Sequence, residues 1–177
     1  GDVSHYTIDS TGKLTRLSPA RAGSQPISVA VHPSGRFAYV VNYASNNVSQ
    51  FRVGSDRSFS PMTTETVSTG EGPWAVAIDP SGRYAYVTNN GGYSVSQYII
   101  SPNGNLISMD PASVSAGQGP MGIMVDPSGK YVYVTNKGNA TISQYTIGSS
   151  GALSPMSSAT VSSFNGTCSI AIVGTYE

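Results

Sequence analysis

The chain has 177 residues, enough for one domain with a hydrophobic core. Its nine basic and nine acidic residues cancel, and charged residues make up only 10% of the chain, so nothing electrostatic favours binding to nucleic acid or to an anionic membrane. No stretch approaches the roughly 20 consecutive apolar residues of a membrane span, and we expect no membrane insertion.

A repeat with a period of 47 residues runs through the chain. A Pro-Ser-Gly turn starts at residues 33, 80 and 127, and a Tyr-Val-(Val/Thr)-Asn run starts at residues 39, 86 and 133. A Ser-Gln-aromatic run starts at residues 49, 96 and 143 in the same frame. A period of this size indicates a repeat architecture, in which residues common to every copy usually build the repeat itself.

In chain order, the sequence begins inside a repeat unit. Residues 3–8 match the third strand of the unit and residues 14–22 match a shortened fourth, so residues 1–24 form a partial unit. Three full units follow, over about 25–70, 71–117 and 118–163. The chain then returns to the first-strand pattern over residues 167–173.

Each full unit is predicted to contain four short strands and no helix. In the second unit, residues 74–79 alternate small and branched side chains, which is the period-2 pattern of a strand. Turn sequences rich in Pro, Asn and Gly then separate further strands at 84–89, 94–100 and about 106–115. Four antiparallel strands at this spacing predict an all-β fold, a β-propeller with three full blades and parts of a fourth.

The phase of the repeat leaves the fourth blade incomplete. Its first strand would come from the C-terminal end and its third and fourth strands from the N-terminal end, with no second strand. Three outcomes are open: a fragment of a longer propeller, two chains joined into a ring of about seven or eight blades, or a four-bladed ring that closes imperfectly. We expect a fragment or a half-ring completed by self-association, because an open arc presents unpaired edges.

The Tyr-Val-Thr-Asn runs, the preceding Asp-Pro-Ser-Gly-Arg turn and the following Val-Ser-Gln-Tyr run resemble the YVTN repeat of β-propellers. That group includes the lactonase-like family related to 6-phosphogluconolactonase and prokaryotic cell-surface proteins. The resemblance covers nearly the whole chain and implies a seven-bladed ring for the lactonase branch. An arginine–glutamate–histidine set for lactone hydrolysis does not map onto this chain, because His5 and His32 replace the repeat glutamine and turn aspartate.

Residues that recur in every repeat are interpreted as structural. The asparagines that end the second strands are expected to bond the following turn, although a ring of such side chains could also contact a ligand. The glutamines of the third strands receive the same interpretation. Asp79 and Asp126 are expected to bond turn amides beside their prolines. They sit in different blades and form no carboxylate pair.

Positions where the repeats differ are better candidates for a site. In a propeller, the loops before the first strands share a face with the loops between the second and third strands. The candidate ligand-binding residues on this channel-mouth face are Glu71, Trp74, Gln118, Met121, Lys137, Asn165 and Cys168. An aromatic platform at Trp74, beside Glu71 and Lys137, would suit a carbohydrate or another small polar ligand. The alternative is that Trp74 only plugs the channel.

Three functions remain open at this stage. The first, which we favour, is a non-catalytic binding or scaffold module, because no catalytic constellation is found. The second is part of a lactonase-like hydrolase acting on a sugar lactone, and the third is an assembly role through open blade edges. No cofactor or metal site is expected, and the single cysteine, Cys168, is expected to be buried and inert. The polar, uncharged composition favours an extracellular or cell-surface location.

Overall fold

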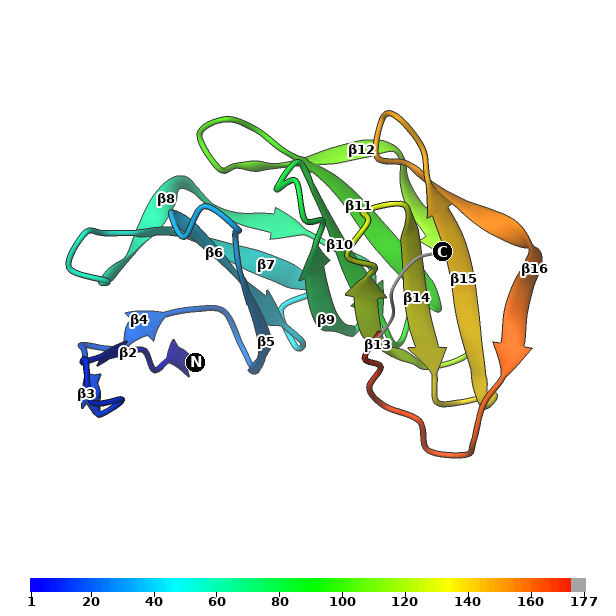
Figure 1. Ribbon diagram of the computed structural model, residues 1–177, viewed down its shortest axis with the longest axis horizontal. Helices are drawn as coiled ribbons and strands as arrows, with labels where there is room; N and C mark the ends of the chain where they lie inside the picture. Colours follow the sequence, from blue (N-terminus) through cyan, green and yellow to red (C-terminus); the bar gives the residue numbers. More distant parts are fainter. Residues whose placement is uncertain (173–177) are drawn as a thin grey trace.

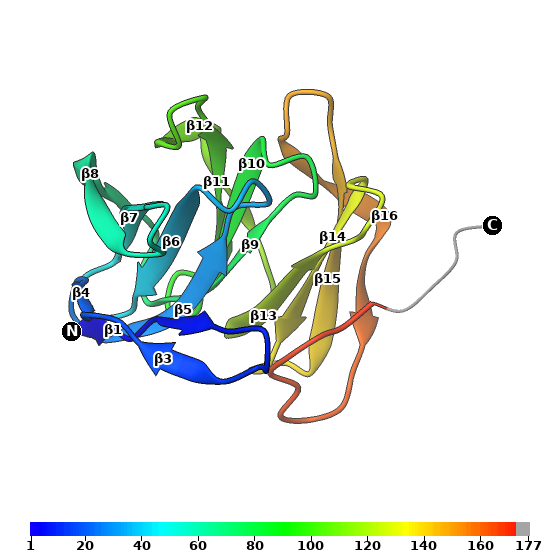
Figure 2. The same cartoon turned by 60° about the vertical axis from the view of Figure 1, so that its left-hand side comes forward.

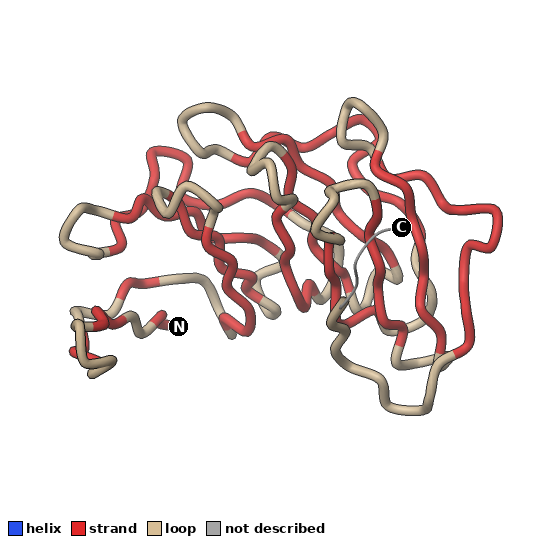
Figure 3. Tube along the Cα trace, viewed as in Figure 1, coloured by secondary structure: helices blue, strands red, loops and turns tan. Residues whose placement is uncertain are grey.

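A computed structural model describes residues 1–172, and the strands and loops of these residues include no helix (Figure 3). The N-terminal hairpin, residues 1–24, contains β1 (Asp2–Val3), β2 (Tyr6–Ile8), β3 (Leu14–Arg16) and β4 (Ala20–Arg21). Blade A contains β5 (Pro26–Val31), β6 (Phe37–Asn42), β7 (Asn47–Val53) and β8 (Phe59–Ser68). Blade B contains β9 (Pro73–Ile78), β10 (Tyr84–Asn89), β11 (Ser94–Ile100) and β12 (Leu106–Ser115). Blade C contains β13 (Pro120–Val125), β14 (Tyr131–Asn136), β15 (Thr141–Ile147) and β16 (Leu153–Ser162).

Each of the three blades is a four-stranded antiparallel sheet in which every strand pairs with its neighbours in sequence. The predicted all-β fold, with three full blades and parts of a fourth, is therefore confirmed. The turn between the first two strands also forms as expected. The carboxylate of Asp79 accepts hydrogen bonds from the backbone N–H of Ser81, at 3.0 Å, and of Tyr84, at 2.7 Å. Asp79 thus shapes the turn.

The N-terminal hairpin has the third and fourth strands of a blade, but both are interrupted. β1 pairs with β4 and β2 pairs with β3, so one long hairpin is divided into two short ladders. The break in the third strand falls at Ser4 and His5, where the other blades have Ser and Gln. In blade A the pairing register between β7 and β8 also shifts at this point, between Ser49 and Phe51.

The blades stand side by side as an open arc, with β5, β9 and β13 along its inner side (Figure 1). The N-terminal hairpin lies at one end of this arc, and residues 163–172 run back along the other end beside blade C. Figure 2, turned by 60°, shows the same succession of blades, each with its first strand innermost. The described residues therefore present one concave side, formed by first strands.

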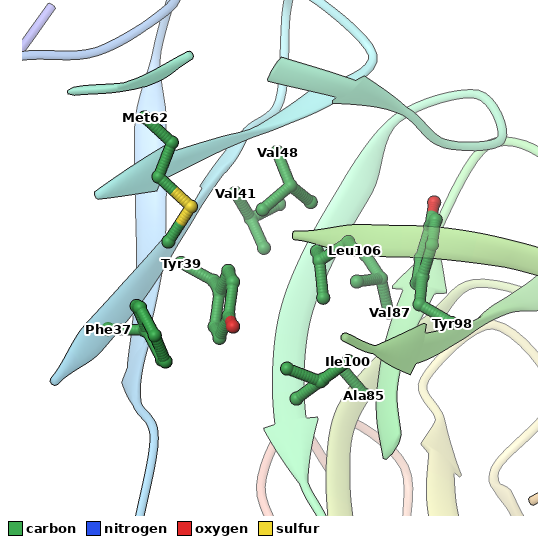
Figure 4. Close-up of a cluster of buried hydrophobic side chains, with 10 residues drawn as sticks. All are labelled: Phe37, Tyr39, Val41, Val48, Met62, Ala85, Val87, Tyr98, Ile100 and Leu106. Carbon is green, nitrogen blue, oxygen red and sulfur yellow. The ribbon is translucent and has the colours of Figure 1, made fainter. Parts of the chain in front are cut away.

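The hydrophobic core lies between the blades rather than within one sheet. In the cluster between blades A and B, Phe37, Tyr39 and Val41 of β6 face Ala85 and Val87 of β10 (Figure 4). A second cluster fills the junction between blades B and C in the same way. A blade face is therefore buried only where the next blade covers it.

Repeated polar side chains tie neighbouring blades together, as two bonds from β11 show. The Gln97 side chain donates to the carbonyl of Pro111 in its own blade, at 3.1 Å. Its amide oxygen accepts the backbone N–H of Leu153 in blade C, at 2.6 Å. In the other direction, the hydroxyl of Tyr98 donates to the carbonyl of Ser68 in blade A. The repeat glutamine is structural, as the sequence predicts.

The repeat asparagines are also structural, but their partners differ from the expected following turn. Asn89 accepts the N–H of Gly70 at 3.1 Å and donates to the hydroxyls of Ser94 and Ser96, at 3.0 and 2.9 Å. The side chain thus fastens the segment before the first strand to the third strand. Since Asn89 is fully buried, it does not face a ligand.

Two expectations about the C-terminal end differ from the structure. The first strand expected over 167–173 is not formed at residues 167–172, and residue 173 lies outside the described residues. Cys168 is exposed, not buried. Both differences have one physical reason, because a first strand obtains its ladder hydrogen bonds and its cover from a second strand, and no described strand pairs with this segment.

Candidate functional site

A pocket of about 300 Å³ lies on the concave side of the arc. It is formed where the first strands of the three blades meet residues 168–170, and the described residues that line it are Ile27, Ser28, Trp74, Ala75, Val76, Gly122, Ile123, Cys168, Ser169 and Ile170. Ser28, Ala75, Gly122 and Ser169 stand 47 residues apart and occupy one column of the repeat. Small side chains in this column leave the space that the pocket occupies.

Trp74 is the largest side chain of this pocket. It is partly exposed at the start of β9, and the ring of Tyr43 from blade A meets it edge-on, with 5.8 Å between the ring centroids and an angle of 88° between the planes. An edge-to-face aromatic contact of this kind fixes the position of the indole while leaving part of it open. The pocket therefore has a positioned aromatic wall.

Hydrogen bonds between asparagine side chains and backbone groups join the loops that precede the first strands to the loops of the preceding blade. The Asn46 side chain in blade A accepts the N–H of Gly72, at 2.8 Å, and the Asn90 side chain in blade B donates to the carbonyl of Pro120, at 3.3 Å. Each loop between second and third strands thus reaches the loop before the next first strand. Because Gly72 has a φ of +57° and its Cβ position would lie 3.1 Å from the nitrogen of Gly91, this loop has little room for a side chain.

The structure brings only two of the predicted site residues, Trp74 and Cys168, into the lining of this pocket. Met121 is buried, and its carbonyl accepts a hydrogen bond from the hydroxyl of Thr88 at 2.8 Å, so it anchors β13 beside β10. The remaining candidates are exposed on loops around the same face: Glu71, Gln118, Lys137 and Asn165. The group of Trp74 with Glu71 and Lys137 stays a prediction, since neither charged residue lines the pocket.

Sequence reasoning missed the two hydroxyl groups of the pocket, Ser28 and Ser169. The signal was available in the 47-residue frame, because the column that contains them holds only Ser, Ala or Gly. Trp74 and Cys168, which the sequence predicts as site residues, directly precede members of this column. The neighbouring column of small residues marks the inner wall of the arc.

The chemistry that this lining offers is recognition through an aromatic surface, hydroxyl groups and backbone amides. Its described residues include no carboxylate, histidine, lysine or arginine. Across residues 1–172, no group of three or more His, Cys, Asp or Glu side chains is placed to hold a metal ion. The same residues include no helix long and apolar enough to cross a membrane.

Comparison with known proteins identifies the architecture. Residues 1–76 match the family model described as lactonase, 7-bladed beta-propeller. The chain has a β-propeller fold, and its first 76 residues resemble the lactonase family. Within the curated proteins, no match reaches significance.

Solved structures extend the likeness in fold over nearly all of the chain. A protein from Lactobacillus plantarum is 22% identical, with a TM-score of 0.83 over 94% of this chain and 51% of that one. The periplasmic gluconolactonase PpgL of Pseudomonas aeruginosa is 22% identical, with a TM-score of 0.74 over 99% of this chain and 51% of that one. A candidate 6-phosphogluconolactonase from Bacteroides fragilis is 20% identical, with a TM-score of 0.78 over 93% and 51%. The chain therefore spans about half the length of these structures.

Proposed function

We propose that this lactonase-like propeller is a binding module, secreted or at the cell surface, whose concave pocket takes a small polar ligand of sugar size. The observation that carries the proposal is the wall at Trp74, which Tyr43 holds in place at the edge of a pocket of about 300 Å³. A sugar ring presents apolar C–H faces and hydroxyl edges, so it matches an aromatic wall next to Ser28 and Ser169.

The composition of the pocket favours binding over catalysis. Lactone hydrolysis needs a group that activates water and donors that stabilise an oxyanion. The only ordinary acid–base group in the described lining is the thiol of Cys168, which donates to the carbonyl of Gly166 at 2.9 Å. We therefore assign this pocket a recognition role.

The test uses the fact that Trp74 is the only tryptophan of the chain. Titration with D-gluconate and with D-glucono-1,5-lactone, followed by tryptophan fluorescence, should give a saturable change. Calorimetry should show that Ser28→Ala reduces the affinity at least tenfold, because the substitution removes the pocket hydroxyl and adds no bulk. The matched control is Ile107→Ala on the outer strand β12, a side chain that is 52% exposed and away from the pocket. No saturable change with either compound, or equal loss in the control, would refute the proposal.

A second candidate function is hydrolysis of a sugar lactone. The match of residues 1–76 to the lactonase family favours it, as does the likeness in fold to a gluconolactonase. Proton release during opening of D-glucono-1,5-lactone, measured against the spontaneous rate in the same buffer, distinguishes the two functions. An enzymatic rate that survives chelator and falls in Glu71→Ala would establish hydrolysis and overturn the non-catalytic assignment.

A further inference from the structure

Basic side chains gather at the opposite end of the first strands from Trp74, where turns lead into the second strands. The residue after the turn glycine is Arg36 in blade A, Arg83 in blade B and Lys130 in blade C, and all three are exposed. In blades B and C the same turn also carries an aspartate, so its formal charge is zero. Blade A lacks that aspartate, and the positive charge of its turn is unbalanced.

His32 replaces the turn aspartate in blade A and keeps its structural role. The backbone N–H of Ser34 donates to Nδ1 of His32 at 3.1 Å, just as the equivalent N–H in blade B donates to Asp79. The other ring nitrogen, Nε2, lies 2.8 Å from the carbonyl of Gly82 in blade B, and it is the donor because a carbonyl only accepts. The turn therefore forms without a carboxylate, and only the negative charge is lost.

The third strand of blade A brings a second arginine to the same place. Arg52 occupies the column that holds Ile99 in blade B and Thr146 in blade C. It stands opposite Phe37 across β6 and β7, and its guanidinium carbon lies 5.6 Å from the centroid of that ring. The guanidinium carbon of Arg36 lies 5.4 Å from the same centroid. Two departures from the repeat thus raise the positive charge at one point.

Neither guanidinium pairs with a carboxylate among residues 1–172. Arg52 donates one long hydrogen bond, at 3.4 Å, to the carbonyl of Asn103 in blade B, and both arginines are exposed. Contact with the ring accounts for each arginine alone. Two like charges beside one ring repel each other, however, and an anion between them would remove that repulsion. The planar guanidinium fork matches the oxygens of such an anion.

We propose that Arg36 and Arg52 form an oxyanion site for a phosphate or sulfate group at the junction of blades A and B. A tetrahedral anion suits the pair, because it presents oxygens to two guanidinium groups at once. Both blades of this junction are complete, and Phe37 belongs to the cluster that joins them (Figure 4). The site is separate from the concave pocket and does not rest on the function proposed for it.

The first experiment is a titration of ¹⁵N-labelled protein with sodium phosphate, compared with sodium chloride at equal ionic strength. The Nε–H signals of Arg36 and Arg52 should shift saturably with phosphate only. Arg52→Thr installs the residue type of blade C and should weaken phosphate binding at least fivefold, because one of the two forks is lost. The matched control is Lys130→Thr, which removes the same charge from the same face in blade C and should change the affinity less than twofold.

A second variant tests the missing carboxylate. His32→Asp restores the turn aspartate of the other blades and should weaken phosphate binding at least fivefold, because it places a negative charge beside the pair. Circular dichroism should show a folded variant, since the same turn forms with aspartate in blade B. Equal shifts with chloride, equal weakening in Lys130→Thr, or unchanged binding in either blade A variant would overturn the proposal.

The anionic group can belong to a free ion or to a polysaccharide, and a sulfated heparin tetrasaccharide distinguishes these sources. A polysaccharide would follow the face past Arg83 to Lys130, so it should bind at least tenfold more tightly than phosphate and weaken in Lys130→Thr as well. Binding no tighter than that of phosphate would identify a free anion. Arg52→Thr should weaken binding in both cases, and a tetrasaccharide that binds this variant and the unmodified protein equally would refute the site.

Discussion

Gly104 offers a quantitative test of how the blades pack. It has a φ of +90°, and a Cβ atom built on it would lie 2.4 Å from the ring of Phe37 in the preceding blade. Gly104→Ala therefore combines two costs. An L-residue in the left-handed region costs about 1–2 kcal/mol, and forcing an extra methyl group into a packed junction costs about 1–3 kcal/mol. We expect a total loss of about 2–5 kcal/mol in the free energy of unfolding.

Gly35→Ala separates the two terms. Gly35 has a φ of +70° in a turn of blade A, and its Cβ position has no atom within 4 Å. Only the backbone term applies, so the expected loss is about 1–2 kcal/mol. Urea denaturation followed by circular dichroism measures both variants. For a chain of this length, each kcal/mol lowers the thermal midpoint by about 2–4 °C.

A double variant identifies the source of the packing term. Phe37→Ala removes the Cγ, Cδ1 and Cε1 atoms of the ring that the new methyl group would strike. In this background Gly104→Ala should cost little more than Gly35→Ala does, because only the backbone term remains. If Gly104→Ala and Gly35→Ala were equally destabilising in the unmodified protein, the inter-blade contact would carry no energy and this reasoning would be wrong.

Three further predictions follow from single contacts. Tyr86→Phe leaves the buried carbonyl of Gly151 without the hydroxyl that now donates to it at 2.7 Å, so urea denaturation should show a loss of about 1–3 kcal/mol. Burial raises the pKa of Tyr98 from 10 to about 12. The contribution of Tyr98 to stability should therefore be constant below pH 10 and fall by about 1.4 kcal/mol per pH unit between 10 and 12, since only the unfolded state ionises there. Gly122→Ala places a Cβ atom 2.7 Å from the carbonyl oxygen of Cys168 and should displace residues 167–172, which faster alkylation of the thiol would report.

A control variant or a contradicting outcome accompanies each of these predictions. Tyr93→Phe removes a hydroxyl from a side chain that is 52% exposed and should change stability by less than about 0.5 kcal/mol. Tyr98→Phe should make the alkaline loss shallower, and an unchanged slope would assign that loss to other groups. For Gly122→Ala, alkylation at the rate of the unmodified protein would show that residues 167–172 do not rest on β13.

The sequence predicts the blades well because the forces that define them are local. Alternation of small and branched residues in β9, and the aspartate turn at Asp79, act within one hairpin and leave a clear pattern. The 47-residue frame then places each hairpin in a blade.

The burial of individual side chains and the lining of the pocket could not be predicted from the sequence, because both depend on neighbouring blades. Val31 and Ile78 occupy the same column of the repeat, but only Ile78 is covered by the preceding blade. Cys168 occupies the column of Trp74, and no described strand covers it. The pattern of a strand shows which face is apolar, whereas its burial depends on whether another blade packs there. The pocket hydroxyls of Ser28 and Ser169 share a column of small residues in the repeat, but only the structure shows that this column lines one pocket.

Two consecutive side chains on β11 have a consequence for how such propellers change in size. Gln97 reaches forward to the following blade and Tyr98 reaches back to the preceding one, at fixed separations of 56 and 30 residues. A gene duplication of 47 residues therefore delivers a unit that carries both connectors and fits between any two existing units. Ring size can thus evolve by whole modules, with no need for the old and new copies to adapt to each other first.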